Sequence, residues 1–190
     1  MIGTPYVIEK VGRNTKLIDI PTKLLDSRKI ILEGDIDEDS TNSVIQQLLW
    51  LDSTSNEDID LYIKSPGGSV TDGLAVKDVI DHISCKVNTI GMGCCASMGA
   101  YLLSCGTGKR RALKNCRYMI HSVSSGTMGT IHDMKISMKE TQYLQDLMME
   151  HLAGFSKGKI SKEELEDKCQ RDVFMSPEEA IKIGLLDEII

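Results

Sequence analysis

The chain has 190 residues, of which 41% are hydrophobic and 26% charged, and its formal net charge is −6 at pH 7. This length suffices for one domain with a sizeable core, and the mixed, acidic charges offer no basic patch for nucleic acid. No apolar run reaches the roughly 20 residues of a transmembrane helix, so we expect binding to neither nucleic acid nor membrane.

Alternating strands and helices are predicted along most of the chain. Residues 9–19 are expected to form an arm, mobile or folded as a β-ribbon, with its tip at Gly12–Asn14. Repeated strand–helix units then favour an α/β fold with a mainly parallel sheet. The predicted elements are a helical turn at 23–25, a strand at 29–34, a helix at 39–51, a strand at 59–64, a helix at 71–83, a strand at 86–91, a helix at 97–105 and a strand at 117–121.

Two of the predicted helices have a recognisable apolar side. The helix at 39–51 is expected to bury Ile45, Leu48, Leu49 and Leu51. The longest helix, at 132–153, is polar overall, rich in Met and poor in aromatics, so we expect it to pack on a partner; a solitary amphipathic surface helix is the alternative. Its apolar positions are Ile136, Met138, Tyr143, Leu144, Leu147, Met148 and Leu152.

Ser97 stands among small residues at a predicted strand-to-helix junction. A strand at 87–90 precedes it, and a helical run follows from Ala100. Such a turn suits a nucleophile, because the bent backbone exposes the side chain and the following amides face the atom that it attacks. The alternative is a serine that caps the next helix, and this stretch alone leaves both interpretations open.

Directly after the strand at 59–64, Pro66, Gly67 and Gly68 predict a turn. Glycines can expose backbone N–H groups that no side chain shields, and these groups can bind an anion. A phosphate loop is disfavoured because the pattern G-x-x-x-x-G-K-[ST] is absent. An oxyanion hole needs a nucleophile nearby, which Ser97 supplies; an ordinary tight turn is the alternative.

Two polar residues in the second half of the chain also stand at predicted junctions. His121 ends the strand at 117–121 and opens a small polar loop, where site residues tend to lie. Asp172 lies shortly before a helix that Ser176 is expected to cap, with Pro177 in its first position. Taken singly, such a histidine is more often structural, and such an aspartate is usually a solvated surface group.

The six cysteines form neither a C-x-x-C pair nor a metal-binding cluster with the histidines, so no metal site is predicted. Free thiols in a reduced, cytoplasmic protein therefore fit better than a disulfide framework. Cys95 offers a cysteine-peptidase alternative, but Ser97 fits the turn better.

Four motifs, in this order and at near-family spacing, resemble the ClpP family of self-compartmentalised serine peptidases over nearly the whole chain. The resemblance implies one peptidase domain over 1–190 with a ClpP/crotonase-like ββα superhelix, an N-terminal axial arm at 1–19 and a handle region with a long helix at 122–155. The motifs are Ser65–Gly73 (SPGGSVTDG), Ala96–Ala100 (ASMGA), Met119–His121 (MIH) and Arg171–Phe174 (RDVF), followed by Glu179–Ala180.

The resemblance assigns roles to five positions. Ser97 is expected to be the nucleophile, His121 its general base and Asp172 the group that orients the imidazole, as in a Ser-His-Asp triad. The backbone N–H groups of Gly68 and Met98 are expected to form the oxyanion hole. No cofactor and no metal are implied.

The loop after the histidine is implied to bind extended polypeptide substrate by β-augmentation, at Ser124, Ser125 and Gly126. The chain departs from the family here, because Gln-Pro and then a Gly-Gly pair usually follow the catalytic histidine. We therefore expect a loop of different local shape.

The resemblance also implies an assembly in the cytoplasm. Seven subunits form a homo-oligomeric ring, two rings stack into a tetradecamer, and an AAA+ unfoldase delivers unfolded polypeptides. Asp60, His82 and Arg111 occupy docking positions that are usually aromatic, so unfoldase docking is expected to be weakened or to need a dedicated partner. Gln170 replaces an acidic residue that usually pairs across the rings, which predicts a looser ring–ring contact.

Three other functions stay open on the sequence. A phage capsid-maturation protease of ClpP type fits the same motifs and the divergent docking positions. A non-catalytic ring subunit typically loses a triad member, whereas all three are kept here. A crotonase-type acyl-CoA enzyme would use the paired amides on a thioester enolate, usually with a Glu or Asp base.

Overall fold

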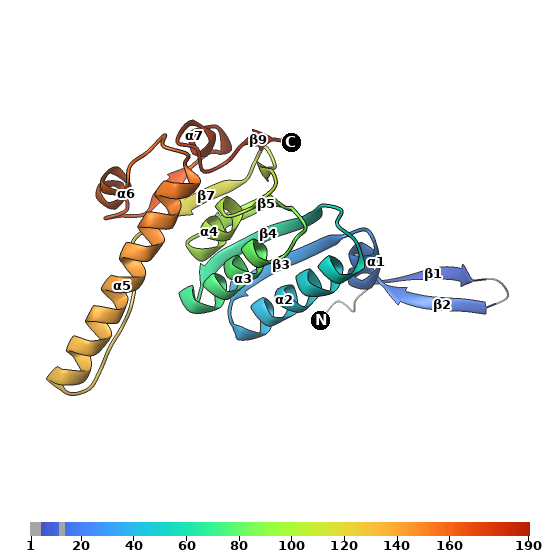
Figure 1. Ribbon diagram of the computed structural model, residues 1–190, viewed down its shortest axis with the longest axis horizontal. Helices are drawn as coiled ribbons and strands as arrows, with labels where there is room; N and C mark the ends of the chain where they lie inside the picture. Colours follow the sequence, from blue (N-terminus) through green and yellow to red (C-terminus); the bar gives the residue numbers. More distant parts are fainter. Residues whose placement is uncertain (1–4, 12–13) are drawn as a thin grey trace.

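The structure is a computed structural model that describes residues 5–11 and 14–190. Strands and helices alternate along most of the chain, which confirms the predicted α/β fold (Figure 1). The elements are β1 (Tyr6–Val11), β2 (Asn14–Asp19), α1 (Ile20–Asp26), β3 (Lys29–Ile36), α2 (Glu38–Thr54), β4 (Ile59–Gly68), α3 (Val70–His82), β5 (Val87–Ala96), α4 (Met98–Ser104), β6 (Arg110–Ala112), β7 (Arg117–Ile120), α5 (Ile131–Phe155), α6 (Lys162–Lys168), β8 (Val173–Met175), α7 (Pro177–Lys182) and β9 (Glu188–Ile189).

A mainly parallel sheet forms the centre of the molecule. Its strands follow the order β3-β4-β5-β6-β9, and each neighbouring pair is parallel. The long strand β5 pairs with β6 through Thr89–Gly91 and then with β7 through Cys94–Ala96. β7 in turn pairs antiparallel with β8. This branching of the sheet is consistent with the predicted ββα superhelix.

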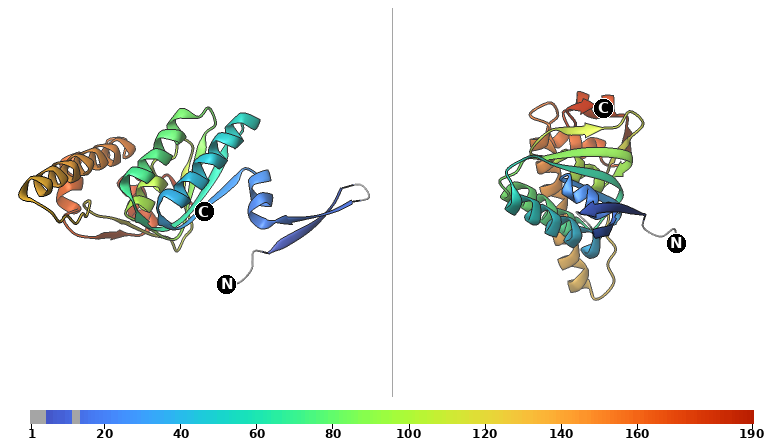
Figure 2. Two further views of the ribbon diagram at one scale, coloured as in Figure 1. Left: turned by 90° about the horizontal axis from the view of Figure 1, so that it is seen from below. Right: turned by 90° about the vertical axis from the view of Figure 1, so that its right-hand side faces the viewer.

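Helices α2, α3 and α4 cover one face of this sheet (Figures 1 and 2). Within α2, Leu48 and Leu51 are buried and Ile45 packs against the core, as expected; Val44, which was not expected there, is buried as well. Leu49 was expected on the same apolar side but is 46% exposed. One residue step turns an α-helix by about 100°, so the position after the buried Leu48 faces solvent.

Strand β4 contains the largest difference from the sequence-based prediction. The expected turn at Pro66–Gly68 is wrong, because β4 continues to Gly68 and pairs with β3 up to Ile36. The ladder overrides the local turn preference after a register shift between Glu33 and Asp35. As a result, the glycines stand beside the end of β5, where Ser97 follows.

Two parts of the chain project from opposite ends of the molecule (Figure 1). At one end, β1 and β2 form an antiparallel ribbon, which confirms the β-ribbon expected within the arm; residues 1–4 and Gly12–Arg13 at its expected tip lie outside the described residues. At the other end, α5 extends far beyond the sheet. Its second half buries Met148, Met149 and Leu152.

Across residues 5–11 and 14–190, none of the helices combines the length and the apolar composition that a membrane span requires. The same residues contain no cluster of three or more His, Cys, Asp or Glu side chains that could hold a metal ion.

Candidate active site

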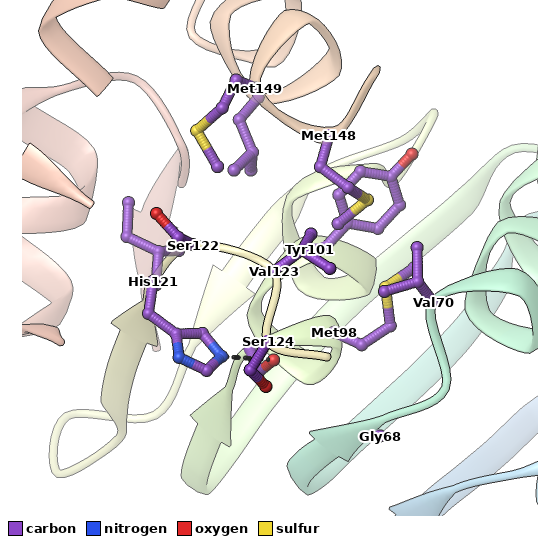
Figure 3. A pocket seen from close by; sticks show the side chains of 13 residues that line it. Gly68, Val70, Met98, Tyr101, His121, Ser122, Val123, Ser124, Met148 and Met149 are labelled. Carbon is purple, nitrogen blue, oxygen red and sulfur yellow. Dashed lines mark hydrogen bonds between the residues drawn. The ribbon is translucent and has the colours of Figure 1, made fainter. Parts of the chain in front are cut away.

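Ser97 links β5 to α4 in a strained backbone conformation, with φ +54° and ψ −123°. Such angles are rare outside glycine and recur at functional turns. Its hydroxyl makes no capping bond to α4, so the helix-cap alternative is wrong. Instead, Ser97 Oγ lies 2.8 Å from His121 Nε2, the bond drawn as a dashed line in Figure 3.

His121 follows the last residue of β7 and lies near Asp172. In the antiparallel β7–β8 pair, Ile120 faces Val173, so the next residues outward, His121 and Asp172, stand opposite each other. The Nδ1–Oδ1 distance is 3.5 Å, too long for a strong hydrogen bond. The Asp172 side chain is 60% exposed, so the histidine–aspartate contact is looser than the serine–histidine contact.

Gly68 and Met98, the two residues expected to supply N–H groups to the oxyanion hole, both line the pocket that contains Ser97. Met98 is the first residue of α4, and the first N–H groups of a helix have no partner within it.

The two glycines of β4 are required by close packing. A Cβ on Gly67 would lie 2.6 Å from the Cβ of Ser97, and one on Gly68 would lie 2.1 Å from the carbonyl oxygen of Ile36. Both positions also have positive φ, at +105° and +153°. Only glycine therefore lets the strand pass so close to the serine.

Ser97 and His121 open into a small pocket of about 60 Å³ (Figure 3). Among the described residues, those that form its remaining wall are mostly apolar and include no Lys, Arg, Asp or Glu, so the pocket suits a small uncharged group. Ser124 belongs to this pocket, Ser125 lines an open groove between the loop and α5, and Gly126 is exposed and lines neither. The other pocket-lining residues are Gly68, Val70, Met98, Tyr101, Ile120, Ser122, Val123, Met148, Met149 and Leu152.

Sequence reasoning did not single out Tyr101 or Met149 as site residues. Tyr101 follows Ser97 by four positions along α4, so helical periodicity could have placed it on the same side. Met149 comes from the distant α5, and no local pattern connects it with Ser97.

Tyr101 also attaches α5 to the site. Its hydroxyl lies 2.6 Å from Nδ1 of His151, and its ring packs edge-on against Phe155 at 5.5 Å. Burial raises the pKa of Tyr101, so the phenol keeps its proton and can donate it. Burial lowers the pKa of His151, which favours the neutral imidazole that accepts this bond.

The cysteines do not supply a nucleophile. Cys95 is completely buried, with its Sγ 3.9 Å from that of Cys116. Its bond with Cys116 and its burial both raise the pKa of Cys95, which opposes thiolate formation. These facts argue against the cysteine-peptidase alternative. Of the six free cysteines, Cys94 alone is exposed.

Two of the expected docking positions have polar neighbours within the chain. Asp60 accepts a 3.1 Å bond from Asn88, and Arg111 Nε lies 3.3 Å from a carboxylate oxygen of Glu188. His82 is exposed at the end of α3.

Gln170, which stands where the family usually has an acidic residue that pairs across the rings, is exposed. Its side-chain amide donates a 3.2 Å bond to Asp167. The side chain is therefore engaged locally, within its own subunit.

Parallel strands end at one small pocket, and a hydrogen-bonded serine–histidine pair lies at the end of a strand. This arrangement is typical of the active site of an α/β enzyme. Comparison with protein-family models matches residues 12–190 to the family described as Clp protease. The chain therefore belongs to the Clp protease family and is a ClpP-type peptidase in general.

Proposed function

We propose that the protein is a serine-type endopeptidase in which Ser97, His121 and Asp172 act as a Ser-His-Asp triad. The observation that carries this proposal is the 2.8 Å contact between Ser97 Oγ and His121 Nε2. A serine hydroxyl is a poor nucleophile until a neighbouring base takes its proton. A crotonase-type acyl-CoA enzyme has no need of such a pair.

In the proposed reaction, Ser97 Oγ attacks the scissile carbonyl carbon while its proton moves to His121 Nε2. The negative charge that develops on the carbonyl oxygen is stabilised by the N–H groups of Gly68 and Met98, each worth ~3 kcal/mol in comparable sites. His121 then protonates the leaving amine. Water, activated by the same histidine, hydrolyses the acyl-enzyme and restores the Ser97 hydroxyl.

The substrates are proposed to be unfolded polypeptides bound in extended form. The exposed loop at Ser124–Gly126 offers backbone groups for β-augmentation beside the pocket. Because the described residues that line the pocket include no Lys, Arg, Asp or Glu, it favours an uncharged residue before the scissile bond.

The assembly is proposed to be a homo-oligomer of two stacked heptameric rings in the cytoplasm, supplied by an AAA+ unfoldase. The exposed apolar side chains on the projecting half of α5 support a contact between rings. The polar surface at Asp60, His82 and Arg111 favours a dedicated unfoldase with complementary polar groups. Gln170 in place of an acidic residue favours a looser ring–ring contact.

One experiment tests the proposal against the alternative of a non-catalytic scaffold subunit. Wild type and Ser97→Ala are treated with a fluorophosphonate, and native mass is measured in parallel. We expect labelling of the wild type only, on a particle of about fourteen subunits, with faster cleavage of peptides that have Ala or Met rather than Lys before the scissile bond. An assembled but unlabelled wild type would point to a scaffold subunit and contradict the proposal.

A further inference from the structure

Ser122 connects the segment that carries His121 to the segment that carries Asp172. Its backbone N–H donates to the carbonyl oxygen of Cys169 at 3.0 Å, and its Oγ donates to the same oxygen at 2.8 Å. Ser122 directly follows the histidine, and Cys169 precedes the aspartate by three positions. Two hydrogen bonds therefore join the chain just after the histidine to the chain just before the aspartate.

Cys169 is a rigid attachment point for this contact. Its side chain is almost completely buried, and its N–H donates a 2.8 Å bond to the carbonyl of Leu165, the one buried residue of α6. The packing of α6 against the core thus fixes the carbonyl that accepts both bonds.

The opposite end of the loop is fixed by the sheet, where Val173 pairs with Ile120. Asp172 lies between these two attachments, and its side chain is 60% exposed. Among the described residues, its carboxylate contacts His121 alone, at 3.5 Å. Because no buried group holds this carboxylate, its position depends on the two ends of the short loop.

We propose that Ser122 is a positioning residue, which aligns His121 with Asp172 by binding the segment after the histidine to the fixed Cys169 carbonyl. This inference rests on the proposed triad. The hydroxyl is the part of the contact that a substitution can remove: Ser122→Ala deletes the 2.8 Å bond and leaves the backbone bond in place. Ser122→Thr keeps a hydroxyl and should retain the function.

The test is a double-mutant cycle between Ser122→Ala and Asp172→Asn, read by cleavage of a short fluorogenic peptide and by the rate of Ser97 labelling with a fluorophosphonate. In the wild-type background we expect Ser122→Ala to lower kcat about tenfold with KM changed less than about twofold, and Ser122→Thr to stay within about threefold of wild type. In the Asp172→Asn background, Ser122→Ala should have an effect below about twofold, because there is no carboxylate left with which to align the histidine.

A purely structural role predicts a different pattern. If Ser122→Ala lowers kcat by the same factor with and without the Asp172 carboxylate, or does not lower kcat in the wild-type background, the inference is wrong. Ser53→Ala is the matched control, since its Oγ also donates to a backbone carbonyl, that of Trp50, but far from the site; it should leave both rates unchanged. If the wild type itself neither cleaves peptide nor reacts with the fluorophosphonate, the triad fails rather than the role of Ser122.

Discussion

At the scale of single residues, the two contacts of His121 differ in quality. Ser97 approaches one ring nitrogen at 2.8 Å, whereas the exposed Asp172 approaches the other at 3.5 Å. A buried triad aspartate contributes about 10⁴-fold to kcat, because it fixes the tautomer and stabilises the imidazolium. A solvated, longer contact should contribute less, since water competes for the same carboxylate.

We therefore expect kcat to fall by different factors when Ser97 and Asp172, the two outer residues of the proposed triad, are replaced. Ser97→Ala should lower kcat by about 10⁶-fold, since the nucleophile is lost, whereas Asp172→Asn should lower it by only about 10²-fold. Steady-state kinetics on one fluorogenic peptide, with native mass as a check on assembly, measures both. Equal losses in the two variants would show that Asp172 becomes fully ordered during the reaction.

At the scale of elements, the bond between Tyr101 and His151 connects α4, which begins beside Ser97, to α5, which forms part of the pocket wall. The pKa of His151 is lowered, chiefly by burial. A histidine with a lowered pKa in the folded state stabilises the fold fully above its ordinary pKa of about 6.5, and this contribution is lost as the pH falls below that value.

Replacing this histidine should flatten the pH dependence of stability. His151→Gln keeps an acceptor for the Tyr101 hydroxyl but cannot titrate between pH 7.5 and pH 5.5. We expect the thermal midpoint of the wild type to fall by a few degrees more than that of the variant over this range. His132→Gln, at an exposed position on the same helix, is the control and should behave as wild type. If the thermal midpoints of wild type and His151→Gln change with pH in parallel, the pH dependence does not come from His151.

The elements also show why local sequence patterns predict only part of the fold. The major helices and the central strands were predictable because their periodicity lies within one segment. Strands β6, β8 and β9 have two or three residues each and exist only through pairing with distant strands. The extension of β4 through Gly68 likewise comes from its ladder with β3, against the local preference of Pro66 and the glycines.

The same limit applies to the site. Ser97, His121 and Gly68 could be singled out because each stands at a junction with a distinctive local composition. The bonds from Ser122 to Cys169 and from Tyr101 to His151 join segments about fifty residues apart. Such contacts depend on the packed fold, and serine or histidine at these positions carries no local signal of them.

At the scale of the whole molecule, the projecting half of α5 exposes apolar side chains to solvent. Ile131, Met134 and Met138 recur at helical spacing and are 70%, 43% and 72% exposed. Side chains at i, i+3 and i+7 share one face of a helix. A continuous apolar stripe in solvent, on a helix far from the core (Figure 1), is the expected surface for a second copy in a stacked ring.

Making this stripe polar should separate the proposed stacked rings without unfolding the subunit. Met and Gln have similar shapes, so the double variant Met134→Gln/Met138→Gln removes apolar contact while preserving volume and helix propensity. We expect sedimentation velocity to show a shift from a double ring toward single rings, with little change in the circular dichroism of the subunit. The matched control, Lys135→Gln/Lys139→Gln, changes neighbouring exposed positions on the same helix and should stay in the double ring. If both variants sediment as wild type, another surface must hold the rings together, and the exposed methionines of α5 would require a different partner.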